Sequence, residues 1–171
     1  LLLPLAIYSA WAARFLRAGV GYEYDEALWV ESAVYMLRGS GTPPFAHEPA
    51  SWISLAGRQW PLMILPYEGA AKALVALPLF AALGIHTEVA RLSSVLLGYL
   101  GIAGLVTLIS ARASPAAGLL VGVLLAFHPS YLDLTLFDNG GSAVWMASMG
   151  LIVLALAFGG GSVGAHHSFA V

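Results

Sequence analysis

Long apolar runs cover most of the chain, and short stretches of polar residues, glycine and proline separate them. A helix that crosses a bilayer needs about 20 predominantly apolar residues. The runs that approach this length predict helices over residues 1–20, 61–84, 87–111, 115–132 and 142–158. The expected fold is therefore all-α: a polytopic membrane bundle of about five hydrophobic helices, forming a single membrane domain over residues 1–171.

The polar segment 21–60, between the first two runs, contains an amphipathic stretch over residues 25–38. The apolar side chains that share one face of a helix there are Trp29, Ala33, Met36 and Leu37. At roughly 14 residues this stretch is too short to cross a bilayer of ~30 Å. We therefore expect a helix lying in the membrane interface, with Trp29 and Tyr35 at the level of the lipid headgroups. The following residues, rich in glycine and proline, predict a loop.

Small residues recur within the later runs at the spacing of one helical turn. Gly98, Gly101 and Gly104 form a stripe in the run 87–111, and Gly118 and Gly122 have the GxxxG spacing in the run 115–132. Such stripes allow two helices to approach closely, so we expect helix–helix contacts at both. Glycine is also frequent in residues 159–171, which predicts a flexible tail.

The composition excludes several classes of protein. Hydrophobic residues make up 60% of the chain and charged residues 9%, and the mean hydropathy is +0.85, far from the soluble globular range. The seven Lys and Arg residues are scattered singly, so nothing indicates nucleic-acid binding. The absence of cysteine excludes disulfides, thiolate metal sites and cysteine nucleophiles.

Four of the nine acidic residues lie close together after the first apolar run: Glu23, Asp25, Glu26 and Glu31. A carboxylate at a membrane surface can act as a general base. Asp25 and Glu26 are the candidates for this chemistry. Each has a structural alternative, because Asp25 can cap the helix that follows and Glu26 can interact favourably with its dipole.

Lys72, Arg91 and Asp138 are the candidates for binding a substrate. Lys72 and Arg91 lie inside apolar runs, where charge is costly and usually functional. Lys72 can instead pair with Glu68 four residues earlier on one helix face, and Arg91 can be an interfacial anchor. Asp138 can simply form an Asx turn with the Asn-Gly-Gly that follows it.

A metal site is weakly indicated. Asp25, Glu26, His47 and Glu48 offer oxygen and imidazole ligands for a divalent cation, but they lack a ligand spacing. No cofactor is assigned on this basis. A glycine loop that would cradle the phosphates of a soluble nucleotide sugar is also missing from the sequence.

The order of these features resembles the N-terminal part of the GT-C superfamily of polytopic glycosyltransferases. That superfamily includes protein O-mannosyltransferases and the enzymes that transfer aminoarabinose to lipid A. The resemblance rests on YDEALWVESAVYML, PLMILPYEGAAKALVALPLFAALG and EVARLSS, in that order, with LFDNGGSAVWM as a looser match to a later turn. It covers residues 1–158, and family members are several-fold longer.

The resemblance implies a sugar donor on a polyprenyl phosphate and an inverting transfer to an acceptor hydroxyl, with Asp25 at the acceptor. Lys72 departs from it, because many relatives have Lys-Pro-Pro about one turn earlier, where Glu68 stands. The implied location is a bacterial cytoplasmic membrane, with segment 21–60 outside and membrane lipids around the helices.

Two other classes compete with this interpretation. The chain can be a non-catalytic transmembrane subunit that packs against other membrane subunits, which the glycine stripes favour. A transporter or channel is less consistent with the sequence, because the ionisable residues cluster at the ends of the runs and no repeated pair of broken helices is present.

Overall fold

The structure is a computed structural model, and it describes residues 1–17, 24–38, 52–65, 68–137, 149–150 and 156. These residues are mostly helical, which confirms the all-α class. The helices are α1 (Leu2–Arg17), α2 (Tyr24–Arg38), α3 (Ala71–Leu83), α4 (Thr87–Arg112), α5 (Pro115–Phe127), α6 (Pro129–Leu132) and the π-helix η2 (Asp133–Phe137). Four short strands form two antiparallel pairs: β1 (Trp52–Leu55) with β2 (Arg58–Pro61), and β3 (Met63–Leu65) with β4 (Glu68–Gly69).

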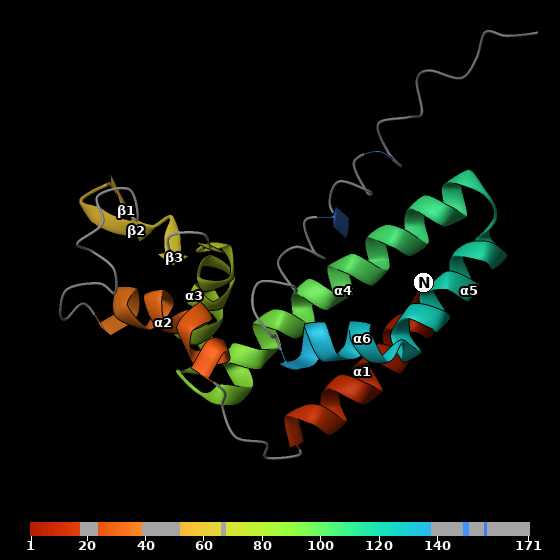
Figure 1. Ribbon diagram of the computed structural model, residues 1–171, viewed down its shortest axis with the longest axis horizontal. Helices are drawn as coiled ribbons and strands as arrows, with labels where there is room; N and C mark the ends of the chain where they lie inside the picture. The colour runs from red at the N-terminus through yellow and green to blue at the C-terminus, as the bar shows by residue number, and fades with distance from the viewer. Residues whose placement is uncertain (18–23, 39–51, 66–67, 138–148, 151–155, 157–171) are drawn as a thin grey trace, which may run out of the picture.

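Helix α4 runs diagonally across the molecule, and the other helices pack along it in two groups (Figure 1). Helices α2 and α3 lie where α4 begins, and α1, α5, α6 and η2 lie along the rest of it. Each group has its own hydrophobic core. The first core contains Val30, Ala33, Ala73, Ala76, Phe80, Val89 and Ala90. The second contains Tyr8, Ala12, Phe15, Val95, Ile102, Val106, Ala126, Tyr131 and Leu136.

Glycines of both predicted stripes lie at helix–helix contacts. A Cβ added at Gly98 would collide with the Tyr8 hydroxyl of α1, and one at Gly104 would collide with the backbone of Gly150. On α5, Gly122 faces Pro4 of α1 and Val106 of α4. The small residues therefore set how closely α1 and α5 approach α4.

The number of candidate membrane spans is smaller than expected. Within the described parts of the chain, only α4 is long and apolar enough to cross a bilayer by itself. A second candidate exists if α5 and the segment Pro129–Leu136, bent by 69° at their junction, count as one broken span. The described residues therefore contain one or two candidate spans in place of about five. The expected helix over 142–158 lies almost entirely outside the described residues, and the tail over 159–171 lies wholly outside them.

The predicted helix over residues 61–84 is also wrong in its first half. Residues 63–65 and 68–69 are strands, and helix α3 begins only at Ala71. Pro61 and Pro66 cannot donate a backbone hydrogen bond, which disfavours a helix interior in this region. At 13 residues, α3 is about 20 Å long, shorter than the hydrocarbon core of a bilayer.

The predicted run 115–132 is broken near its end. Ser114 caps α5, with its hydroxyl accepting a hydrogen bond from the Ala117 amide at 3.1 Å. The helix stops at Phe127 because Pro129 disfavours the helical conformation of His128, whose φ and ψ are −72° and 119°. The chain therefore turns sharply here instead of continuing as one straight span.

Helix α2 matches the predicted amphipathic helix in its bounds but not in its surroundings. Trp29 is 4% exposed and Ala33 is fully buried, because α2 packs on α3. The expectation of Trp29 at headgroup level is therefore wrong, since the indole is covered by protein. Asp25 lies inside the helix, which begins at Tyr24, and not at the expected capping position.

Candidate functional site

Glu26 and Arg91 form a bidentate ion pair in the interior. The Arg91 Nε donates to Glu26 Oε1 at 2.9 Å, and Nη2 donates to Oε2 at 2.8 Å. Glu26 is 1% exposed and Arg91 is 3% exposed. The fork of a guanidinium matches the two oxygens of a carboxylate, so this pair is both strong and directional. It ties the beginning of α2 to the beginning of α4.

Phe15 of α1 completes the surroundings of the Arg91 side chain. The guanidinium carbon lies 4.8 Å from the centre of the Phe15 ring, a distance at which the ring attracts a cation. Phe15 belongs to the second core, whereas α2 belongs to the first. Arg91 is therefore held from both sides and connects the two groups of helices.

Lys72 is the third charged residue of this cluster. It lies in the first turn of α3 and is 1% exposed. Burial lowers the pKa of Lys72 to about 7, with Glu26 opposing the shift and Arg91 adding to it. The buried charge cluster thus comprises Glu26, Lys72 and Arg91, from three different helices. A buried lysine that titrates near neutrality can exchange a proton at physiological pH.

The two cations lie near helix ends at which the helix dipole disfavours positive charge. Lys72 and Arg91 both lie near helix N-termini, where the dipole disfavours positive charge, while Glu26 near the start of α2 is favoured. Burial adds a desolvation cost to each charge. Packing alone does not explain two cations at these positions, which makes the cluster a candidate site.

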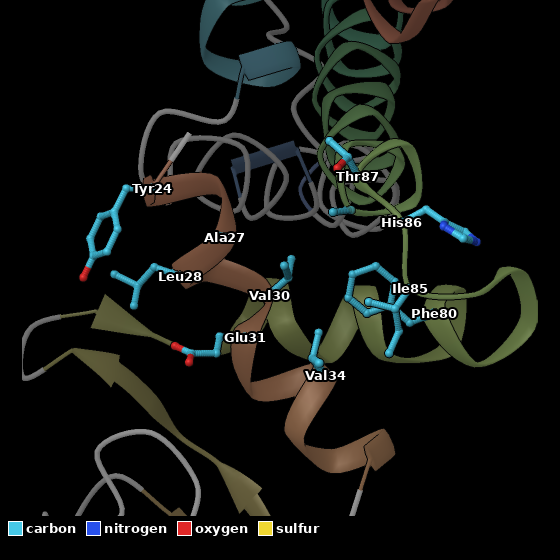
Figure 2. Close-up of a pocket in the computed structure, with 11 residues that line it drawn as sticks. Tyr24, Ala27, Leu28, Val30, Glu31, Val34, Phe80, Ile85, His86 and Thr87 are labelled. Carbon is cyan, nitrogen blue, oxygen red and sulfur yellow. The ribbon is translucent and has the colours of Figure 1, made fainter. Parts of the chain in front are cut away.

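A groove of about 530 Å³ lies on another face of α2, between this helix and the turn from α3 to α4 (Figure 2). Its lining is mostly apolar, and Val30, Val34, Phe80 and Ile85 face one another across it. The polar residues of the lining are Tyr24, Glu31, His86 and Thr87. The volume and the apolar lining are those of a site for a small molecule or for part of a lipid.

The structure brings together three of the five predicted site residues: Glu26, Lys72 and Arg91. Asp25 lies in the first turn of α2, but its side chain is outside what the structure describes, and so is all of Asp138. Glu68 lies in β4 and Lys72 in α3, so the predicted pairing of these two on one helix face is wrong. The proposed catalytic role of Glu26 also changes, because both of its oxygens bind Arg91.

No group of three His, Asp or Glu side chains among the described residues is arranged to hold a metal ion. His47 and Glu48, two of the residues considered for such a site, lie outside those residues. Sequence reasoning missed the role of Phe15, since nothing in its local pattern distinguishes it from other apolar residues. It also missed the pairing of Glu26 with Arg91, although their opposite charges in apolar surroundings were a signal.

No protein-family model, curated protein or solved structure matches the chain.

Proposed function

We propose that the chain is the membrane-embedded N-terminal part of a GT-C-type glycosyltransferase, which moves a sugar from a polyprenyl phosphate to an acceptor hydroxyl. The membrane assignment is supported by α4, a helix of 26 residues with the length and composition of a span. In this proposal the membrane is the bacterial cytoplasmic membrane, and segment 21–60 faces outside.

One observation carries the proposal. The three sequence segments that resemble this superfamily each contribute one residue to the buried charge cluster: Glu26 from YDEAL, Lys72 from EGAAKAL and Arg91 from EVARLSS. These residues span 65 positions of sequence, yet Glu26 and Arg91 are in direct contact and both affect the pKa of Lys72. The contact between these segments supports the proposal, while Lys72 itself departs from the Lys-Pro-Pro pattern of many relatives.

The proposed reaction is a single displacement. Asp25 accepts the proton of the acceptor hydroxyl as its oxygen attacks the anomeric carbon, and the bond from that carbon to the phosphate oxygen breaks. The lipid phosphate leaves with the bonding electrons, and the protonated form of Lys72 stabilises its charge, since the Arg91 Nε and Nη2 already donate to Glu26. Attack from the side opposite to the phosphate inverts the anomeric centre.

Glu26 has a positioning role in this scheme. Its two oxygens orient the guanidinium of Arg91, and they fix the beginning of α2, where Asp25 is the preceding residue. The apolar groove along α2 supplies a surface for the hydrocarbon part of a lipid-linked substrate.

The test is sugar transfer by the full-length protein in vesicles, with polyprenyl-phosphate mannose and polyprenyl-phosphate aminoarabinose as donors. We expect Asp25→Asn to abolish turnover while donor binding is retained, because only the proton acceptor is lost. Asp133→Asn is the matched control, since Asp133 is exposed on η2 and far from the cluster in sequence. Full turnover by Asp25→Asn overturns the assignment of the base.

A non-catalytic transmembrane subunit is the second candidate function. The observation that favours it is the completeness of the Glu26–Arg91 pair, whose buried side chains are occupied with each other. In this case the pair has a structural role alone, which is to hold α2 against α4. Two results would support this function. The wild-type protein neither transfers the sugar nor binds the donor, and the protein is purified in a complex with other membrane proteins.

A further inference from the structure

The β1–β2 hairpin has two chemically different faces. Its strands pair antiparallel, with Ile53 opposite Trp60 and Leu55 opposite Arg58. Side chains alternate between the two faces of a strand, so these four residues share one face. The other face carries Trp52, Ser54, Gln59 and Pro61.

Both faces of the hairpin are exposed next to the turn, and they differ in the side chains that they present. Gln59 donates a hydrogen bond to the Ser54 hydroxyl at 2.8 Å. On the opposite face, Ile53 is 46% exposed and Leu55 is 60% exposed. Ser54 and Gln59 on the other face are also exposed, so the hairpin presents aliphatic side chains on one exposed face and hydrogen-bonded polar side chains on the other.

A hairpin of two strands is marginally stable in water, so this one needs a surface to cover its apolar face. The hairpin lies on the side of the molecule on which α4 begins, next to α2 (Figure 1). If α4 crosses a bilayer, its first residues lie at one membrane surface. The hairpin then lies near the boundary between water and lipid.

The charge on this face identifies the lipid. Arg58 is exposed and pairs with Leu55 next to the turn, and Trp60 lies on the same face. Arginine attracts anionic headgroups, and tryptophan is enriched where headgroups meet acyl chains. We propose that the face formed by Ile53, Leu55, Arg58 and Trp60 docks on an anionic lipid bilayer, with Ile53 and Leu55 entering the acyl region. This binding does not depend on the proposed transferase activity.

The chain has no cysteine, so single cysteines can be labelled one at a time. The experiment places a nitroxide at Leu55→Cys and, as the matched control on the other face, at Ser54→Cys. The full chain is reconstituted in phosphatidylcholine vesicles with or without phosphatidylglycerol. Oxygen, which concentrates in lipid, and a water-soluble nickel chelate then report the surroundings of each label.

We expect the label at position 55 to be accessible to oxygen and protected from nickel, and the label at position 54 to show the reverse. Adding Arg58→Ala should reduce the inserted fraction in phosphatidylglycerol vesicles about fivefold, the effect of one cation at an anionic surface. Ile53→Cys and Gln59→Cys repeat the comparison in case Leu55→Cys disturbs the hairpin.

Equal exposure of both faces to nickel overturns the proposal. Protection of position 55 from both reagents also overturns it, because that result means that protein covers the face. If the protection is accompanied by spin–spin broadening, the covering protein is a second copy of the chain.

Discussion

Glu26 and Arg91 are 65 residues apart in the sequence and share two hydrogen bonds in the interior. The pair connects the first turn of α2 to α4, and Phe15 of α1 lies against the same guanidinium. Removing one member of a buried pair leaves the other charge without its partner, which costs more than the pair contributes. Substitutions at these two positions therefore test whether the cluster holds the helices together.

We expect Arg91→Met to lower the free energy of unfolding by about 3–5 kcal/mol, because the Glu26 carboxylate then remains buried without its guanidinium. Glu26→Gln should also destabilise the fold, because the buried Arg91 guanidinium loses its counter-charge, although the amide oxygen still accepts one hydrogen bond. Denaturant unfolding in detergent measures both. The double variant Glu26→Gln/Arg91→Met should be more stable than Arg91→Met alone. If the two single effects simply add in the double variant, the residues do not interact as described.

Lys72 should make stability depend on pH in a defined direction. Burial lowers its pKa to about 7 in the folded state, below its usual value of 10.5. Between pH 7 and 10.5 the unfolded state binds the proton and the folded state does not, so stability rises with pH. Below pH 7 both states are protonated and this contribution stays constant.

The expected contribution to the slope is at most about 1.4 kcal/mol per pH unit in that range. The unfolding of the wild type and of Lys72→Met is measured in detergent as a function of pH. The difference between the two profiles gives the contribution of Lys72 to the slope. The variant should lack this part of the slope. Identical pH profiles for the two proteins would mean that Lys72 keeps its ordinary pKa.

Gly98→Ala should destabilise the contact between α1 and α4. A Cβ at this position collides with the hydroxyl of Tyr8, and overpacking of this kind costs about 1–3 kcal/mol. The better helix propensity of alanine works in the opposite direction. Combining Gly98→Ala with Tyr8→Phe removes the nearest atom of the clash, and we expect partial recovery of the thermal midpoint. Equal destabilisation with and without Tyr8→Phe would show that the hydroxyl is not the obstacle.

Ala56→Asn should stabilise the β1–β2 hairpin. Ala56 has φ +51° and Gly57 has φ +73°, so both central residues of the turn are in the left-handed region. Alanine is strained there by about 1 kcal/mol, and asparagine tolerates it better. Amide hydrogen exchange should slow about fivefold across β1 and β2. Ser54→Asn, outside the turn, is the control and should not slow exchange.

The sequence predicted the helices whose patterns are long or clearly bounded. Helix α4 was expected over 87–111 and spans Thr87–Arg112, because a continuous apolar run follows a polar turn. The start of α5 was predicted at residue 115, and the helix begins at Pro115 with Ser114 as its cap. Among the site residues, Lys72 and Arg91 were identified because charge inside apolar sequence is costly.

The strands and the partners of the charges could not be predicted from the sequence. Residues 61–65 are apolar, and so short an apolar run has no period that distinguishes a strand from part of a helix. The Ala-Gly turn is a weaker signal than Asn-Gly. The partner of Arg91 depends on how α2 packs on α3 and α4, which is a property of the tertiary fold. Local spacing suggested Glu68 as the partner of Lys72, and the fold placed Lys72 near Glu26 instead.

Arg91 belongs to neither hydrophobic core and touches residues from both groups of helices. A displacement of Glu26 would consequently move the Arg91 guanidinium and, through it, the Phe15 ring of α1.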